Sequence, residues 1–304
     1  MRRRLKMALI SLLLATPAAA DWRLAFPVFR IGIVTGSATS TTLPAYEPFR
    51  AYMEDVIGVP VELIPAPNLA ALIDAHTSKR VHYAVYSASA YAVAWTMCKC
   101  IEPLVAPRAS DGSLGYHAII VARDGGSIGA MKDLENKKIA YSISGSVAGH
   151  LVPVAEMRRA GIDPQTYFST SVHAASSRAG VKAVLEGDVA AATAWSSLQG
   201  AKNKGYSRGT LRDLTDTGEL DPAMLRIIWK SRQIPHGPHA VLNQLPPKLL
   251  SLLRQSLLAI DLEDPAAYDA VERHLGGGFA VVGHDEYGPL LDMIKPEHIK
   301  KAAK

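Results

Sequence analysis

The sequence has little charge, few aromatic residues and almost no cysteine. Charged residues make up 20% and aromatic residues 7% of the 304 positions, and there are two cysteines. The formal net charge is only +5, which gives no sign of a basic surface for nucleic acid. Beyond the N-terminus, apolar runs such as Ile119–Ala122 have the length of a strand and are too short to cross a bilayer.

Several signatures of catalytic and metal sites are also missing. The sequence contains no SxxK and no HExxH, and Gly145–Gly149 does not have the serine of a nucleophile elbow at its centre. Ser146 and His150 could mimic a Ser–His pair, but such a pair needs a third group to orient the histidine. His236 and His239 supply two imidazoles, fewer than the ligands of a zinc site. We therefore predict a protein that is not an enzyme and needs no cofactor, with a hydrolase and a metal-binding protein as alternatives.

What is present first is a secretory signal. Basic residues at the start are followed by the apolar run Met7–Thr16 and by small residues at Ala18 and Ala20. This order predicts a cleavable signal peptide over residues 1–20 and a protein that works in the periplasm. Removal of its four basic residues leaves a net charge of +1 on the remainder.

The two cysteines, Cys98 and Cys100, allow two readings. An oxidising compartment permits a disulfide, which would close a very tight ring. A reduced thiol pair would instead favour thiophilic ions. The cysteine pair follows a helix of about ten residues. The N-terminus of that helix is expected to face a ligand cleft, so the cysteines would lie about 15 Å from a bound ligand. A disulfide, or a thiol pair without a ligand role, is therefore at least as good an interpretation as an ion site.

Short β-rich runs alternate with helical patterns along the chain. The strand pattern Arg30–Val34 is followed by the helical pattern Tyr46–Val56 and the strand pattern Val61–Ile64, and a similar series restarts at Tyr116–Ala122. Such alternation predicts an α/β fold with mainly parallel sheets. We expect two lobes with a ligand cleft between them. Lobe 1 would comprise residues 21–108 with 235–304, and lobe 2 would comprise residues 109–234.

One loop has the pattern of an anion site. A strand is expected to end at Ser142, a run of small residues follows, and a helix begins near Ser146. The first turn of a helix leaves backbone N–H groups unpaired at the positive end of the helix dipole, which suits an anion. A serine that caps the helix with nothing bound explains the same residues equally well.

Five stretches share the pattern of one known family. They are Val81–Tyr86, Asp111–Tyr116 with Ile119–Val121, Lys132–Ala140, Gly145–Gly149 with Leu151–Pro153, and Ile228–Ser231 with Ile234 and Pro235. On these stretches the chain resembles the PhnD-like periplasmic phosphonate- and phosphite-binding proteins of ABC transporters. The resemblance spans nearly all of the chain after residue 20. It implies a two-lobed type II periplasmic-binding-protein fold.

The resemblance also implies the residues that face the ligand. Aromatic contacts would come from Tyr86 and Tyr116, and the anion would meet the hydroxyl of Ser146 and the backbone of Val147, Ala148 and Gly149. Where the family has two further hydroxyls, this chain has Val147 and Ala148. Further contacts would come from Ser176, Ser177 and Arg178, where the family has a histidine before the helix.

The positions at which this chain differs from its resembled relatives narrow the range of expected ligands. The acidic residues that hold an amino group in aminoethylphosphonate binders align with Ser197 and Gly237, so an aminoalkyl phosphonate is disfavoured. We expect a monomer that closes on a smaller oxyanion, such as phosphite, a phosphonate or phosphate, and is read by an ABC permease. The alternative is an arsenite sensor that signals to a membrane histidine kinase, because a branch of arsenic-oxyanion sensors resembles the same family.

Overall fold

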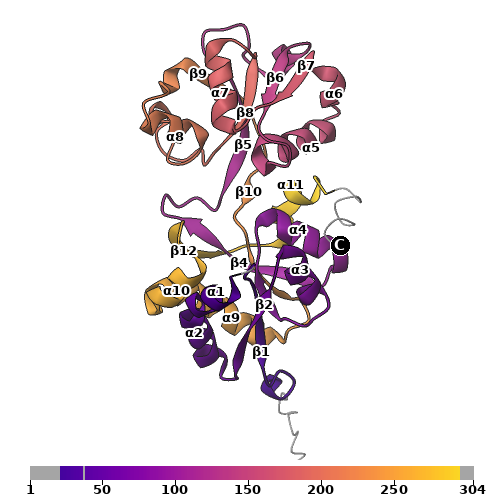
Figure 1. Ribbon diagram of the computed structural model, residues 1–304, viewed down its shortest axis with the longest axis vertical. Helices are drawn as coiled ribbons and strands as arrows, with labels where there is room; N and C mark the ends of the chain where they lie inside the picture. The colour runs from indigo at the N-terminus through magenta and orange to yellow at the C-terminus, as the bar shows by residue number, and fades with distance from the viewer. Residues whose placement is uncertain (1–20, 37, 295–304) are drawn as a thin grey trace, which may run out of the picture.

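The computed structural model describes residues 21–36 and 38–294, and its chain forms two α/β lobes joined by extended segments (Figure 1). The expected signal peptide over residues 1–20 lies outside the described residues. In the part of the chain that is described, no helix is long and apolar enough to span a membrane.

The first lobe is built on a six-stranded sheet with the order β12-β4-β11-β3-β1-β2. Its strands are β1 (Phe29–Val34), β2 (Val61–Ala66), β3 (Tyr83–Val85), β4 (Ile101–Ala109), β11 (His239–Leu242) and β12 (Gly276–Val281). Strand β1 runs parallel to β2 and β3, whereas β11 and β12 run antiparallel to their neighbours. The carboxyl ends of β1, β2 and β3 therefore meet at one edge of this sheet.

Helices cover this sheet. They are α1 (Thr39–Ala45), α2 (Glu47–Ile57), α3 (Leu69–Thr77), α4 (Ala88–Cys98), α9 (Pro247–Glu263), α10 (Pro265–Val271) and α11 (Gly288–Leu291). Helix α9 shows why they form where they do: Leu249, Leu253, Leu257 and Ile260 recur every three or four residues and are all buried. Asp264 then ends α9 and caps α10, since its side chain accepts a hydrogen bond from the backbone of Ala267.

The second lobe has its own sheet, with the order β10-β5-β8-β6-β7 and with β9 paired to β5. Its strands are β5 (Gly115–Arg123), β6 (Lys138–Tyr141), β7 (Thr170–His173), β8 (Ala191–Ser196), β9 (Leu225–Lys230) and β10 (Ile234–Pro235). Its helices are α5 (Val152–Arg159), α6 (Pro164–Tyr167), α7 (Ser177–Glu186) and α8 (Thr210–Asp216), with a π-helical turn, η3 (Val147–Leu151), directly before α5. Strands β6, β7 and β8 are parallel, so the loops after them share one edge.

The chain passes between the lobes along β4 to β5 and returns beside β10 (Figure 1). On the return, Ile234 and Pro235 pair with β5 in the second lobe, and His239 pairs with β3 and β4 in the first. The lobes are also connected beside α11. There, Arg232 is hydrogen-bonded to Glu156 of α5 at 2.7 Å and to Asp292, directly after α11. The segment 234–239 is therefore held by strand pairing to both lobes, and we call it the return crossover.

Candidate functional site

A cavity of about 300 Å³ lies where the return crossover passes between the lobes. We call it the hinge cavity. Its walls come from both lobes: residues after β3, the start of β5, and the return crossover. The lining residues are Val85, Tyr86, Ser87, Ala88, Pro107, Tyr116, Pro235, His236, Gly237, His239, Glu272 and Leu275. The structure thus brings the two tyrosines expected to face the ligand, Tyr86 and Tyr116, to one cavity although they are 30 positions apart.

Tyr116 forms an aromatic wall of this cavity. Its ring lies edge-on to Trp195, with centroids 5.6 Å apart, and nearly parallel to His236, with centroids 6.4 Å apart. The strand pair Tyr116–Ile234 fixes its backbone against the return crossover. Burial raises the pKa of the Tyr116 hydroxyl, so the group stays protonated and can donate a hydrogen bond.

His236 is a lining residue that carries an unused polar atom. Its Nδ1 donates to the carbonyl of Pro107 at 2.7 Å, and this bond fixes the proton on Nδ1 in the neutral ring. Its Nε2 is buried and has no partner among the described residues. Burial lowers the pKa of the ring, so the ring is neutral and Nε2 is an acceptor without a donor among the described residues.

Tyr86 lines the cavity, but its hydroxyl is engaged in the first lobe. That hydroxyl lies 3.2 Å from Nδ1 of His76, and the two rings are stacked with centroids 5.8 Å apart. Both residues are buried. Tyr86 therefore offers the cavity its backbone and ring, while its hydroxyl is held by a core histidine.

The turn at Ser146–Gly149 has the local geometry of an anion site. Ser146 caps η3, and its hydroxyl oxygen accepts from the backbone N–H of Gly149 at 3.1 Å. The carbonyl of Ser146 accepts from the N–H groups of both His150 and Leu151, which gives the wide π turn. Among the described residues, the backbone N–H groups of Val147 and Ala148 have no acceptor. Ala148 belongs to the same hydrophobic cluster as Ala118 and Ile234, next to Tyr116.

Gly149 allows this turn to pack against its own strand. A Cβ at Gly149 would lie 2.3 Å from Cβ of Ser142 and 2.8 Å from Oγ of Ser146. Its carbonyl accepts from the backbone of Ser142 at 3.0 Å and from the hydroxyl of Thr193 at 2.6 Å. Only glycine fits this approach, so the position of η3 depends on it.

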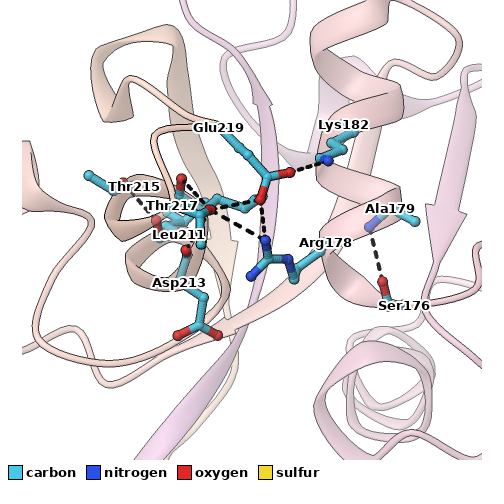
Figure 2. Close-up of polar contacts among 10 residues, drawn as sticks. Ser176, Arg178, Ala179, Lys182, Leu211, Asp213, Thr215, Thr217 and Glu219 are labelled. Carbon is cyan, nitrogen blue, oxygen red and sulfur yellow. Dashed lines mark hydrogen bonds and ion pairs between the residues drawn. The ribbon is translucent and has the colours of Figure 1, made fainter.

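Ser176, Ser177 and Arg178 open helix α7, after the neighbouring strand β7. Ser176 is its cap, and its hydroxyl accepts from the backbone of Ala179 at 3.1 Å (Figure 2). The guanidinium of Arg178 turns to Glu219, and it also lies 3.3 Å from the hydroxyl of Thr217 (Figure 2). Glu219 is held by Lys182 as well, and these contacts lower its pKa to about 2. The charge of Arg178 is thus already matched by a carboxylate 41 positions away.

The sequence-predicted residues therefore fall into two groups. Tyr86 and Tyr116 line the hinge cavity, whereas Ser146–Gly149 and Ser176–Arg178 begin helices after β6 and β7, at the edge of the second sheet. Ser87 and His236 also line the hinge cavity, although neither is among the ligand residues predicted from the sequence. Ser87 could have been found from the sequence, because a serine between a strand and a helix is typical of a helix N-cap. Its hydroxyl accepts a hydrogen bond from the backbone N–H of Ala90 at 3.2 Å.

Gly237 and Ser197 are the two positions expected to align with the acidic residues of aminoethylphosphonate binders. A Cβ at Gly237 would lie 2.0 Å from the carbonyl oxygen of Tyr86. Ser197 is buried, and its hydroxyl lies 2.8 Å from that of Ser207. Neither position offers an anionic group to an amino substituent of a ligand.

Cys98 and Cys100 form a disulfide at the C-terminal end of α4, with their Cα atoms 5.0 Å apart. Lys99 between them adopts the left-handed conformation. The helix begins beside Ser87 in the hinge cavity and runs for 11 residues, so its far end lies about 16 Å away. The structure therefore agrees with the first of the two interpretations, a disulfide, and not with a reduced thiol pair.

The alternatives of a serine hydrolase and a metal site gain no geometric support in the described ranges. The hydroxyl of Ser146 is bonded to Gly149, and no hydrogen bond joins it to His150. Two stretches match GxSxG. Ser127 lies on an exposed turn after β5, and the hydroxyl of Ser207 is hydrogen-bonded to Ser197 and Asp111 rather than to a histidine. Within residues 21–36 and 38–294, no three His, Cys, Asp or Glu side chains gather to hold a metal ion.

Comparison with known proteins identifies relatives over most of the chain. The model of the family described as "ABC transporter, phosphonate, periplasmic substrate-binding protein" matches residues 31–287. A phosphate-import protein PhnD of Mycolicibacterium smegmatis is 26% identical over 239 residues, which cover 74% of this chain and 69% of that protein.

Solved structures are similar to the chain at lower identity. XAC2383 from Xanthomonas citri, solved with ATP, aligns with a TM-score of 0.56 at 17% identity and covers 91% of this chain and 98% of that one. A binding protein component of an ABC phosphonate transporter from Pseudomonas aeruginosa aligns with a TM-score of 0.47 at 21% identity and covers 91% and 87%. Together with the two sheets, the family match confirms the predicted two-lobed type II periplasmic-binding-protein fold.

Proposed function

The chain belongs to the family of periplasmic substrate-binding proteins of phosphonate ABC transporters, and on that basis we propose that it binds a small phosphorus oxyanion in the hinge cavity. Proteins of this family are periplasmic and serve a membrane transporter. The chain is thus a small-ligand binding protein whose membrane partner is an ABC permease. The proposal concerns the identity of the oxyanion and the residues that bind it.

The observation that carries the proposal is the unpartnered Nε2 of His236. A buried acceptor without a donor is costly, and a ligand that fills the cavity can supply the donor. The monoanions of phosphite, phosphate and methylphosphonate each carry a P–OH group that can donate to a neutral imidazole. The hydroxyl of Tyr116, beside His236, can donate in turn to an unprotonated oxygen of the same ligand.

The second half of the site is proposed to come from the turn at Ser146–Gly149. The free N–H groups of Val147 and Ala148 and the positive end of the η3–α5 segment suit an oxyanion. Ser176 and Ser177 begin the helix after the adjacent strand, so their backbone groups would join the same face. Closure of the lobes would bring these helix starts to an anion held by Tyr116 and His236.

Ligand size and substituents follow from the walls of the hinge cavity. Gly237 and Ser197 offer no carboxylate to an amino group, and Arg178 is already paired with Glu219. Glu272 also lines the cavity, but its carboxylate accepts hydrogen bonds from the backbone N–H groups of His274 and Leu275. Recognition would thus rest on hydrogen bonds from neutral groups and on helix dipoles. Phosphite, phosphate and methylphosphonate are the proposed ligands, and aminoethylphosphonate is expected to bind more weakly.

A thermal-shift panel tests this function on the protein purified from the periplasm of an expression host. A ligand present at 100 times its Kd stabilises the folded state by about 2.7 kcal/mol. We expect phosphite, phosphate or methylphosphonate to raise the Tm, with a smaller effect of aminoethylphosphonate. A shift with arsenite alone would replace the importer function with that of an arsenic sensor. No shift with any of these, nor with arsenate, would rule out oxyanion binding.

Replacement of His236 by phenylalanine tests the site itself. The change keeps a ring but removes the imidazole acceptor, and the affinity for the best ligand of the panel is expected to fall about tenfold, the effect of one lost hydrogen bond to a charged ligand. Isothermal titration calorimetry measures this change. The matched control is His274→Phe, at an exposed histidine outside the hinge cavity. Equal affinities of the two variants would remove His236 from the site.

A further inference from the structure

The second lobe contains another cavity, of about 350 Å³, away from the crossover. We call it the α5–α6 cavity, because it is enclosed by η3, helices α5 and α6, and strand β7. It shares no lining residue with the hinge cavity. In Figure 1, α5, α6 and β7 lie together on one side of the upper lobe. A volume in this range is typical of small-molecule sites.

Two residues that line this cavity have buried polar atoms without partners. Tyr141 is only 3% exposed, and its hydroxyl has no hydrogen bond in the described part of the chain. The Nδ1 atom of His150 is likewise buried and unpaired. The two rings lie edge to face with centroids 5.2 Å apart. Such atoms are rare in folded proteins unless something else satisfies them, and a polar ligand in the cavity would do so.

The charges around the cavity favour an anion. Arg158 lies on its wall and has no ion-pair partner among the described residues, whereas the adjacent Arg159 lies 3.9 Å from Asp292. No acidic side chain lines the cavity. His173 donates from Nδ1 to the carbonyl of Ser142 at 2.7 Å, and the hydroxyls of Thr170 and Ser171 add further donors. An anion would therefore meet one unmatched cation and several hydroxyl groups.

The remaining walls favour a flat apolar body on that anion. Phe168, Val154 and Pro164 line the cavity, and the ring of Phe168 lies edge-on to Tyr141 with centroids 6.3 Å apart. Aromatic rings pack well against such edges. A bare phosphate or phosphite would leave most of this apolar wall uncovered.

From this combination we propose that the α5–α6 cavity is a second ligand site, for a small aromatic carboxylate. The carboxylate binds Arg158 and the hydroxyls of β7, the ring packs on Phe168, and a polar substituent or edge of the ligand meets Tyr141 and His150. This site is independent of the hinge cavity. It would stand even if the oxyanion proposal failed.

Isothermal titration calorimetry with benzoate at pH 7 tests the site on the whole protein. Benzoate is expected to bind, and Arg158→Gln is expected to weaken that binding about tenfold, because a charge-assisted contact is lost. Arg159→Gln, one position along the same helix and outside the cavity, is the matched control and should change it less than about twofold. The uncharged probe benzamide should bind about tenfold more weakly than benzoate.

A second variant separates binding from folding. Tyr141→Phe removes an unsatisfied buried hydroxyl, so it should not lower the Tm, yet it should weaken the binding of a hydroxylated probe, 4-hydroxybenzoate. The proposal would be overturned if no binding is detected at benzoate concentrations up to about 10 mM, because a Kd above that value is too weak for a specific site. Equal benzoate affinities of the Arg158 and Arg159 variants would overturn it too. Saturation with phosphite should leave benzoate binding unchanged, and competition between them would place benzoate in the hinge cavity instead.

Discussion

Acidification from pH 7 to pH 5 is expected to destabilise the folded protein by about 4 kcal/mol through two core histidines. Burial lowers the pKa of His239 to about 3 and that of His76 to about 4, against an ordinary value of 6.5. Both rings are therefore neutral in the folded state, and the unfolded chain binds more protons below pH 6.5. Stability is complete above pH 6.5 and falls as the pH drops toward the folded-state pKa values. At pH 5 each ring contributes about 2 kcal/mol of this loss.

Denaturant unfolding at pH 7 and pH 5 measures this difference. His76→Gln is expected to reduce it by about 2 kcal/mol, because one of the two buried titrations is removed. The exposed His274 provides the matched control, and His274→Gln should leave the difference unchanged. His82, whose pKa is also lowered by burial to about 4, adds a further loss of stability to the one expected from His76 and His239. Equal stability of the wild type at both pH values would contradict the buried, neutral state of these rings.

Replacement of Gly237 by alanine is expected to cost about 3 kcal/mol of stability, at the upper end of overpacking effects. The new Cβ would lie 2.0 Å from the carbonyl oxygen of Tyr86 and 3.0 Å from Cα of Ser87. These are backbone atoms, and the N–H of Tyr86 is itself bonded to the carbonyl of Pro238 at 3.0 Å. The crossover and the end of β3 would have to separate. The hinge cavity would change shape, and we expect oxyanion binding to fall with stability.

Thermal unfolding with and without the best ligand of the panel measures both effects. Gly129→Ala is the matched control, because a Cβ there would meet nothing nearer than 3.6 Å. That variant should keep both the Tm and the ligand-induced shift of the wild type. A Gly237→Ala protein as stable as the Gly129→Ala protein would show that the crossover can move away from β3. Position 237 could then accommodate an acidic side chain as well.

The hinge cavity and the turn at Ser146 divide the proposed site between the lobes. Tyr116 and His236 are fixed by pairing of β5 with the return crossover, whereas Val147 and Ala148 are fixed to the edge of the second sheet. Binding at both places at once would tie ligand capture to the angle between lobes. An importer subunit and a sensor would use the same closure, so the ligand panel distinguishes them better than the fold does.

The sequence by itself determined the family and the fold class. Alternating strand and helix patterns predict layered α/β lobes because each element must bury one apolar face, and those patterns are local. The motifs around Tyr86, Asp111–Tyr116 and Lys132–Ala140 then identified the family, which the match over residues 31–287 confirms. Ser142–Gly149 was recognised for the same reason: a strand end, small residues and a helix start are adjacent in the chain.

Only the tertiary structure decided which of these residues share a cavity and which are already engaged. His236 meets Tyr116 across 120 positions, because the return crossover pairs with β5. Arg178 forms an ion pair with Glu219, and the hydroxyl of Tyr86 is hydrogen-bonded to His76. A charge or hydroxyl in a sequence gives no sign of whether a distant partner will satisfy it. Hydrogen bonds and ion pairs depend on distances of a few ångströms, and long-range packing alone sets those distances.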